Sequence, residues 1–446
     1  MKRHLLLPIL AISLTTSIQA AEFRAAVGKT DITPPLGYEL WGYAAREKGA
    51  VAVLDPLYAR ALVLDDGTIR LALVTLDLGR TFGPAAMDRL RNRVRTSAGV
   101  QQVYFLASHT HSGPVIEDSY ADNKLPPWES EALNKIGAAI EQAVQRMAPC
   151  RIGTGQGQTY IGYNRRTVQL DGSPKMLWRN PTKLLTSPVD PTVGVIRVDD
   201  MSGKPVAILV HYSCHAVVFG ADNLRYSADF PGVMAKTVED AFDNAPICFF
   251  LQGAPGDINP YFATTRLEED ADRMMKETGE QLGKEAVRVA RSVSTKAPAK
   301  PSLKHALDVM NFPIRWDMEK TSAIAQAMPR SRSSERYLKS FSDPVSCPVM
   351  TLLINDEIAL AGMPGEPFVE FAIDFRSRSP AKNSFLVGYA NGYSAYFPTI
   401  RDAVIGGYGA DSLTTRVEVG AGEAMVNHAI VSLYKMLGLL KPVPSR

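Results

Sequence analysis

Continuous apolar runs recur along the chain and predict its strands. The apolar positions in these runs do not alternate with polar ones, which is the pattern of strands covered on both faces. Such strands belong to the interior of a layered protein rather than to an open, half-solvated sheet. Buried strands are predicted over residues 69–77, 103–107, 193–198, 205–211, 247–252 and 349–354, with a further strand-like segment at 358–361.

Longer segments between these runs carry apolar positions three and four residues apart, the period of an amphipathic helix. The two patterns together predict a mixed α/β fold in which layered mixed β-sheets are flanked by helices. Helices are predicted over residues 84–97, 129–147, 231–241, 267–290, 368–377 and 423–437.

No internal repeat and no Gly/Ser-rich linker interrupts this pattern. A chain of 446 residues suggests two or three domains by length alone, but large α/β folds often exceed that rule. The pattern therefore shows no firm domain boundary, and length alone leaves the number of domains open. A polar stretch rich in Ser and Arg, residues 315–346, is predicted to be a solvated segment, the alternative being an exposed helical insertion or a lid.

The first twenty residues have the three zones of a secretory signal. Lys2 and Arg3 precede an apolar run over residues 5–14, and Ser-Ile-Gln-Ala then ends at residue 20. The apolar run is too short to span a bilayer, which disfavours a retained membrane anchor. The sequence therefore predicts a cleaved signal peptide over residues 1–20 and a periplasmic or secreted protein.

Charge and cysteine content exclude several classes of protein. Lys and Arg number 49 against 46 Asp and Glu, a formal charge of +3, so we expect no nucleic-acid partner. The hydrophobic fraction of 46% is enough for a sizeable core. Four cysteines without a Cys-x-x-Cys motif are too few for a disulfide-stapled scaffold, and no pairing is predicted.

Two histidine pairs follow predicted strands. His109 and His111 come directly after the run at 103–107, and a His-x-His pair at a strand end places both imidazoles near one pocket. Two histidines satisfied by backbone hydrogen bonds are the equally simple alternative. His211 and His215 would share one face if the chain turned helical, but Tyr212 replaces the Glu of the metalloprotease motif, which disfavours that class.

Three turns after apolar segments carry further polar chemistry. Asp257 and Asn259 lie in a Gly-rich turn after the run at 247–252, where the backbone can approach a ligand closely. Glu366 lies in a Pro-Gly-Glu turn before a predicted helix, and capping of that helix is the local alternative. The stretch at 388–398 contains more tyrosines than a loop that only covers a core would need, and buried phenols near a cation can be ligands or donors.

These stretches occur in an order that resembles the neutral/alkaline (non-lysosomal) ceramidase family, specifically its amino-terminal catalytic domain. The resemblance runs from about Ala26 to about Thr414. Each motif is weak alone, and the set is specific. The motifs are residues 28–35, Gly42-Tyr43-Ala44, residues 109–114, Asn223-x-x-x-Ser227-x-Asp229, Gly256-Asp257-x-x-Pro260 and Pro364-Gly365-Glu366.

The resemblance implies a hydrolase of the ceramide amide bond with one Zn²⁺ per chain. A zinc site with N and O ligands and an open position is catalytic rather than structural, and it activates water and polarises a carbonyl. The family pattern implies His109, His215, Glu366 and Tyr396 as metal ligands and Arg165 as a substrate-contacting residue. With this set in place, we expect His111 to be the proton shuttle, Tyr408 and Asn259 to stabilise the oxyanion, and Asp257 and His211 to line the substrate pocket.

Two departures from the family pattern bear on the substrate. Asn259 stands where the family carries Ser, and an amide can donate to an oxyanion but cannot form an acyl-enzyme. The motifs span most of the chain, so we also expect residues 21–446 to form a single ceramidase-like catalytic domain, without the carboxy-terminal immunoglobulin-like domain that is typical of the family. The substrate is expected to be a small or lipid-like acyl compound, with an amide first and an ester or lactone as the alternative. Transient contact with a membrane surface is an expectation from the family alone, and no oligomeric state is predicted. A non-catalytic exported binding protein is the remaining alternative.

Overall fold

The computed structural model describes residues 22–43, 46, 48–120, 122, 124–315, 343–411 and 414–441. The predicted signal peptide and most of the polar stretch at 315–346 lie outside these residues. Within the described ranges, no helix has both the length and the apolar character that crossing a bilayer requires.

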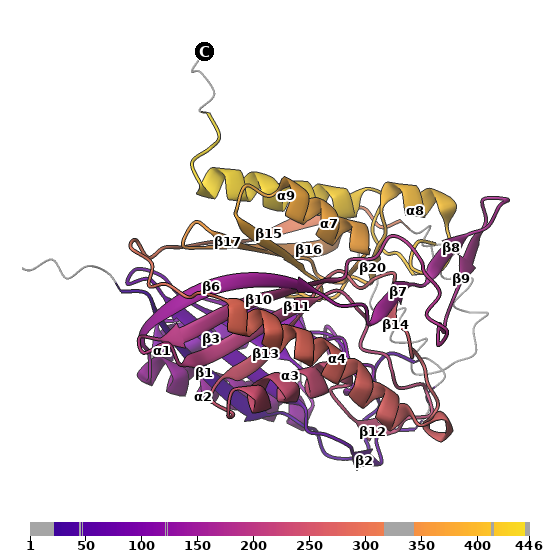
Figure 1. Cartoon of the computed structure of the whole chain (residues 1–446), viewed down its shortest axis with the longest axis horizontal. Helices are drawn as coiled ribbons and strands as arrows, with labels where there is room; N and C mark the ends of the chain where they lie inside the picture. The colour runs from indigo at the N-terminus through magenta and orange to yellow at the C-terminus, as the bar shows by residue number, and fades with distance from the viewer. Residues whose placement is uncertain are drawn as a thin grey trace, which may run out of the picture.

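Two β-sheets lie face to face between two layers of helices (Figure 1). One helical layer, α1 to α4, covers the outer face of the larger sheet, and α7 and α9 cover the smaller one. This four-layer arrangement confirms the predicted fold. The helices are α1 (Pro84–Ala98), α2 (Pro127–Gln145), α3 (Phe230–Ala241), α4 (Ala271–Ser292), α7 (Val369–Arg378), α8 (Ile400–Ile405) and α9 (Ala421–Met436), with a short 3₁₀ turn η2 (Leu267–Glu269).

The larger sheet has eight strands in the order β13-β11-β10-β6-β1-β3-β4-β5. It is mixed, because β4 pairs with β5 and β11 with β13 in parallel while the other neighbours are antiparallel. The strands are β1 (Arg24–Asp31), β3 (Tyr58–Asp65), β4 (Arg70–Leu76), β5 (Gln102–Ala107), β6 (Ala148–Gln158), β10 (Thr192–Asp200), β11 (Pro205–Tyr212) and β13 (Ile247–Gln252).

The smaller sheet has the order β15-β16-β17-β19 and is also mixed. Four two-stranded pairs, β2–β12, β7–β14, β8–β9 and β18–β20, lie outside the two large sheets. The remaining strands are β2 (Ala52–Val53), β7 (Gly162–Asn164), β8 (Arg166–Val168), β9 (Pro174–Met176), β12 (Arg225–Tyr226), β14 (Ile258–Pro260), β15 (Leu303–Phe312), β16 (Val345–Ile354), β17 (Ile358–Gly362), β18 (Glu366–Pro367), β19 (Asn383–Val387) and β20 (Tyr396–Phe397).

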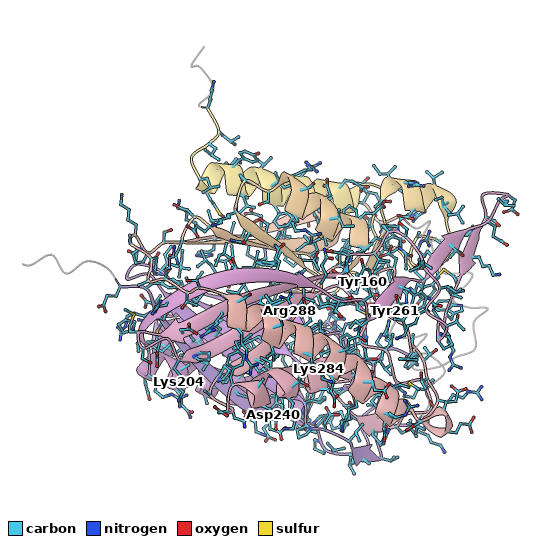
Figure 2. All side chains as sticks on the ribbon, viewed as in Figure 1. Tyr160, Lys204, Asp240, Tyr261, Lys284 and Arg288 are labelled. Atoms are coloured by element: carbon cyan, nitrogen blue, oxygen red, sulfur yellow. The ribbon has the colours of Figure 1, made fainter. Side chains whose placement is uncertain are left out.

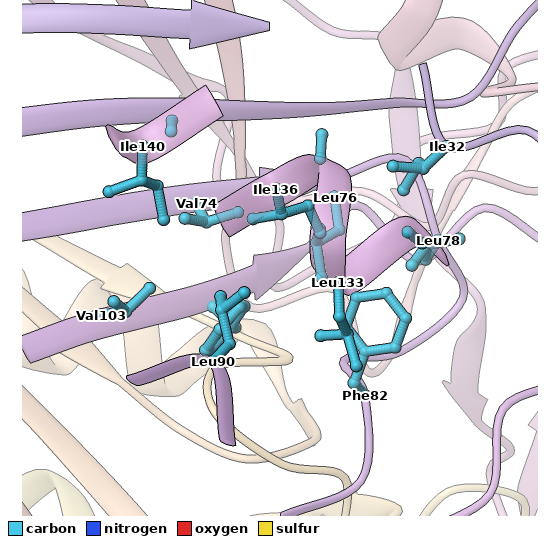
Figure 3. Close-up of a cluster of buried hydrophobic side chains, with 14 of the residues drawn as sticks. Ile32, Val74, Leu76, Leu78, Phe82, Leu90, Val103, Leu133, Ile136 and Ile140 are labelled. Carbon is cyan, nitrogen blue, oxygen red and sulfur yellow. The ribbon is translucent and has the colours of Figure 1, made fainter. Parts of the chain in front are cut away.

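Four clusters of buried apolar residues lie between the layers of the described structure. Between the sheets, Leu73 and Leu251 pack in one cluster with Leu352 and Phe385. Beneath the larger sheet, strand residues such as Val74 meet residues of α1 and α2, which Figure 3 shows in close-up. A continuous apolar run places alternate residues in two different cores, which is why the buried strands carry no polar face.

Helix α4 shows the opposite pattern, since only one of its faces is apolar. Met275, Leu282 and Ala286 are buried against the larger sheet and α3. Lys284 and Arg288 project outward and are more than half exposed (Figure 2). The solvent-facing side of α4 is therefore charged, as expected for a helix that lies between a core and solvent.

Candidate functional site

His109 and His111 lie at the carboxyl end of β5, on the turn that leaves the larger sheet. His109 has a left-handed backbone, with φ of 64°, and its N–H donates to the carbonyl of Leu78. A left-handed non-glycine residue costs conformational free energy, and such residues concentrate at functional sites. The turn brings the two Nε2 atoms to 3.0 Å from each other, which confirms that both imidazoles face one pocket.

The wall behind His111 is closed by residues from the amino-terminal end of the chain. The Tyr43 ring lies edge-on to the imidazole, with centroids 4.9 Å apart. Arg46 donates to the carbonyl oxygens of His111 and Trp41, and so ties the two segments together. Gly42 leaves no room for a side chain, because a Cβ there would lie 2.3 Å from the His111 ring.

His215 and Glu366 meet in the same pocket although they come from different layers of the fold. His215 Nε2 lies 3.0 Å from Glu366 Oε2, and His109 Nε2 lies 3.8 Å from the same oxygen. Both histidines and the glutamate are almost fully buried. The assignment of His215 rather than His211 to this group therefore agrees with the geometry.

Parallel pairing of two short strands places Glu366 beside Tyr396. In the β18–β20 pair, Glu366 is the direct partner of Tyr396. The other carboxylate oxygen, Oε1, accepts a hydrogen bond of 2.7 Å from the Tyr393 hydroxyl. The carboxylate is thus fixed from one side by a phenol and presents Oε2 to the histidines.

His109 and His215 both present a ring-nitrogen lone pair to this site. His109 Nδ1 lies 2.7 Å from the carbonyl oxygen of Gly79, and His215 Nδ1 lies 2.6 Å from that of Pro255. A carbonyl only accepts, so both Nδ1 atoms carry the proton and both Nε2 atoms carry the lone pair in the neutral rings. Ring nitrogens of His109, His111 and His215 lie within 4.8 Å of one another. The donor set fits a divalent cation, since metal-bound histidines usually donate their second N–H to a carbonyl in this way.

The pKa values of these groups favour the forms that bind a cation. Burial lowers the pKa of His109 to about 4, and burial also lowers those of His111 and His215. Burial opposes ionisation of Glu366, but His109, His215 and Tyr393 outweigh it and lower its pKa to about 2. Neutral imidazoles and an ionised carboxylate are the protonation states that a metal site needs.

Arg165 lies on the other side of Tyr396 and is almost fully buried. Its Nη2 donates to the Tyr396 hydroxyl at 3.1 Å and to the carbonyl of Gly256 at 2.7 Å, and its Nη1 donates to Asn259 Oδ1 at 3.1 Å. The Tyr408 ring lies over the guanidinium and packs against the Tyr396 ring. The structure therefore brings Arg165, Asn259 and Tyr408 together beside Tyr396, and their roles with substrate remain predictions.

Asp257 and His211 are held by structural contacts. Asp257 accepts from Asn164 Nδ2 and from the backbone N–H of Val369 at the start of α7, and burial raises its pKa to about 7. His211 Nε2 lies 2.7 Å from the carbonyl of Leu386 in β19. These hydrogen bonds join Asp257 and His211 to the surrounding fold and not to His109, His215 or Glu366. The part of both residues in substrate binding stays a prediction.

Three aromatic residues of this region have roles that sequence analysis did not assign. Tyr389 stacks on His109 with centroids 4.0 Å apart, Tyr393 orients Glu366, and the Trp178 ring contacts Tyr408. The excess of tyrosines in the stretch at 388–398 was the available signal, but it did not say which phenol would face which ligand. Trp178 gave no signal, because it lies in a loop of ordinary composition.

The four cysteines do not enter the site. Cys150, Cys214, Cys248 and Cys347 are buried free thiols, and burial raises the pKa of each.

Known ceramidases are similar to this chain in sequence and in fold. The family model for the amino-terminal part of neutral/alkaline non-lysosomal ceramidases matches residues 23–293, more than half of the chain. The neutral ceramidase of Drosophila melanogaster is 23% identical over 251 residues, which cover 53% of this chain and 35% of that protein. Neutral ceramidase A of Dictyostelium discoideum is 26% identical over 202 residues, covering 42% of this chain and 26% of that protein. The matched part of the chain thus spans between about a quarter and about a third of the length of these relatives.

Solved structures share the fold over almost the whole chain. A ceramidase complexed with C2 superposes with a TM-score of 0.75 at 18% identity, covering 96% of this chain and 77% of that one. The neutral ceramidase from Pseudomonas aeruginosa gives a TM-score of 0.73 at 19% identity, covering 96% and 76%. With the matched family model, these findings show that the chain belongs to the neutral/alkaline non-lysosomal ceramidase family.

Proposed function

We propose that this protein is an exported, zinc-dependent hydrolase that cleaves the amide bond of an N-acyl, ceramide-like substrate with water. Family membership supports hydrolysis of an amide, and the buried histidine group supports a metal. Export is proposed from the signal-like residues 1–20.

The contact between His215 and Glu366 carries the proposal. Because His215 Nδ1 holds the ring proton against a carbonyl, the Nε2 lone pair faces the Glu366 carboxylate at 3.0 Å. Two acceptors at hydrogen-bond distance in a buried site repel each other unless a cation lies between them. A protonated imidazole would also satisfy the contact, but burial lowers the pKa of His215 and disfavours that form.

Four side chains would hold the metal: His109, His215, Glu366 and Tyr396. A bound zinc ion supplies Lewis-acid polarisation of the carbonyl and lowers the pKa of a water ligand toward neutrality. The Gly79 and Pro255 carbonyls orient the two histidines, and Tyr393 orients Glu366.

The proton of the attacking water is assigned to His111. Its ring is neutral, since burial lowers its pKa well below the usual value, and its Nε2 lies 3.0 Å from His109 Nε2, beside the proposed metal ligands. Tyr408 and the Asn259 amide would stabilise the developing oxyanion, and Arg165 would hold a polar group of the substrate. Fixing these groups in a buried pocket lowers the cost of reorganisation during the reaction.

Metal analysis coupled to a substrate panel tests the proposal. The purified protein should contain one equivalent of zinc and should release amine from at least one N-acyl compound in a chelator-sensitive reaction. Turnover of O-acyl compounds alone would replace amide by ester or lactone as the substrate. A metal-free protein that is inert on the whole panel would be a binding protein, contrary to the proposal.

Export is tested separately, by fractionation of the source cells and mass spectrometry of the mature amino terminus. A mature chain that begins near residue 21 in the periplasm or medium supports export, and an intact chain retained inside the cell contradicts it.

A further inference from the structure

Arg165 is a buried cation whose hydrogen-bond partners are all neutral. The side chain is 4% exposed, and it donates to the Asn259 amide, the Gly256 carbonyl and the Tyr396 phenol. Its Nε–H is buried without a partner among the described residues. Buried arginines usually pair with a carboxylate, because an uncompensated buried charge costs several kcal/mol. The site therefore holds a guanidinium with an unused donor and no anion bonded to it.

Three aromatic rings surround this guanidinium. Its central carbon lies 5.3 Å from the ring centroid of Tyr408, 5.7 Å from that of Tyr396 and 5.8 Å from that of Trp178. Tyr408 and Trp178 are 39% and 46% exposed and contact each other, so solvent reaches the far side of these rings. The rings stabilise the cation, and two of them, Tyr408 and Trp178, lie at the partly exposed edge of the site.

The charge balance of the pocket favours an anion once a metal is bound. Glu366 is the carboxylate that faces the histidine group, and His109 and His215 are neutral rings that donate to backbone carbonyls. A divalent cation beside one carboxylate and one guanidinium leaves excess positive charge in a region of low dielectric constant. An anionic group on the substrate would compensate that charge and would use the free N–H of Arg165 in a charge-assisted hydrogen bond.

We propose that Arg165 forms an anion subsite and that the substrates are N-acyl amino acids, in which a carboxylate lies beside the scissile amide. This inference rests on the proposed hydrolase activity. Arg165 is one hydrogen bond from Tyr396, and Tyr396 is the strand partner of Glu366. The carboxylate of an α-amino acid is two bonds from the amide nitrogen, so a substrate of this class spans the short distance from the reacting carbonyl to the guanidinium.

Asn259 holds the Arg165 guanidinium in place without neutralising its charge. It lies on β14, where it pairs with Tyr163 of β7, and its Oδ1 accepts from Arg165 while its Nδ2 faces the Trp178 carbonyl at 3.5 Å. An amide acceptor orients the guanidinium without neutralising it. The shorter Ser of the family pattern would not span from the Arg165 guanidinium to the Trp178 backbone.

Two matched substrates test the inference on the zinc-loaded protein. N-dodecanoylglycine and N-dodecanoylethanolamine share the acyl chain and the amide, and differ by a carboxylate in place of a hydroxymethyl group. We expect kcat/KM to be at least tenfold higher for the glycine conjugate, mainly through KM. Arg165→Met and Asn259→Asp should each reduce this ratio to near one, since the first removes the cation and the second pairs it with a carboxylate of the same shape.

Arg179→Gln is the matched control. Arg179 is an exposed arginine that pairs with Glu269 on the same side of the molecule, so its loss should leave the ratio within about twofold. If Arg165→Met does not fold, the kcat/KM ratio of Asn259→Asp decides between the outcomes. That substitution replaces a single heavy atom of a buried side chain and is expected to preserve the fold. Equal or better turnover of the ethanolamide by the wild-type protein, or a ratio that survives both variants, overturns the anion subsite. Absence of turnover on every N-acyl and O-acyl compound overturns the hydrolase proposal instead.

Discussion

Hydrogen bonds from residues outside the ligand set decide how the candidate ligands point. Glu366 Oε1 is occupied by the Tyr393 hydroxyl, which leaves Oε2 as the oxygen that faces His215. His109 is fixed twice, by the Gly79 carbonyl at Nδ1 and by the Tyr389 ring stacked on its face. Orientation of this kind raises the affinity of a site without adding a ligand.

Replacement of Tyr393 by Phe removes one hydroxyl and the hydrogen bond to Glu366. We expect about 10- to 100-fold weaker zinc binding, the usual effect of losing such a partner. Competition with a chromophoric chelator measures the change. Tyr160→Phe removes the hydroxyl of an exposed tyrosine and should leave zinc affinity unchanged. Equal affinity in the two variants would show that Tyr393 does not orient a metal ligand.

Replacement of His109 by Ala removes the ring nitrogen that lies 3.0 Å from His111 Nε2 and 3.8 Å from Glu366 Oε2, and it should abolish stoichiometric zinc binding. Elemental analysis of the purified variant gives the result. His428, which is partly exposed and pairs with Asp308 on a different part of the surface, provides the control, and His428→Ala should retain one zinc. A His109→Ala protein with full zinc content would contradict the ligand assignment.

The histidine pair at 109 and 111 was predictable because the local backbone alone brings the two rings together. The partnership of His215 with Glu366 was not predictable from local pattern, since the two residues are 151 positions apart and meet only through the packing of two sheets. The family resemblance supplied it. Tyr393 could not be assigned for a related reason, because the three tyrosines of the stretch at 388–398 look alike in sequence until the turn geometry orients each ring.

At the scale of elements, β6 shows how packing can override composition. Its Gly153, Gly155 and Gly157 alternate along one face, and this face lies against α4 and the segment that follows it. A Cβ at Gly153 would lie 2.5 Å from the carbonyl oxygen of Ser294, and one at Gly155 would lie 2.8 Å from Val293. The strand therefore needs glycine where the helical layer comes closest.

Gly153→Ala should lower the free energy of unfolding by about 1–3 kcal/mol, because the added methyl group meets backbone that has little room to move. Urea unfolding measures the change. Gln156→Ala alters an exposed position of the same strand and should change stability by less than about 0.5 kcal/mol. Equal stability of Gly153→Ala and the wild type would mean that the layers separate more easily than the contacts indicate.

Asp257 links the Gly-rich turn to the first turn of α7, and its titration gives a pH dependence. Burial raises its pKa to about 7, above the value of about 3.9 in an unfolded chain. Between about pH 4 and pH 7 the folded protein retains a proton that the unfolded chain has lost, so this residue makes the free energy of unfolding fall as the pH rises. Asp257→Asn should remove that part of the slope in urea titrations at successive pH values. Parallel pH profiles for the variant and the wild type would contradict the assignment.

The predicted helices and apolar strands all appear, with ends displaced by a few residues, because burial on both faces leaves a clear signature in sequence. Two of the missed strands, β6 and β15, lack that signature. β6 has glycine at alternate positions, and β15 is half-exposed along most of its length, so neither forms a continuous apolar run. These two strands are defined by their backbone pairing with β10 and β16, respectively, and not by a pattern of side chains.

At the scale of the whole molecule, the candidate metal site joins the two sheets. His109 and His215 follow β5 and β11 of the larger sheet, whereas Glu366 and Tyr396 follow β17 and β19 of the smaller one. A metal held by both sets would add a link between layers that also contact through the apolar cluster between the sheets. Binding to the folded state only would then stabilise the entire fold.

Removal of zinc by a chelator should lower the unfolding midpoint of the wild-type protein in thermal scans. Saturation of a site at 100 times its dissociation constant contributes about 2.7 kcal/mol, enough for a clear shift. Glu366→Ala should unfold at a midpoint that the chelator does not change. A wild-type protein whose midpoint is also unaffected by the chelator would contradict a structural link through the metal.

The separation of His215 from Glu366 along the chain also bears on the order of events during biogenesis. The larger sheet can form, and bring His109 and His215 together, while the last two hundred or so residues are still unfolded. Glu366 joins these histidines only when the smaller sheet has packed against the larger one. Tight metal binding would thus require that folding is complete. A chain stalled halfway would release the ion readily, and bound zinc would distinguish finished molecules from those still subject to proteolysis.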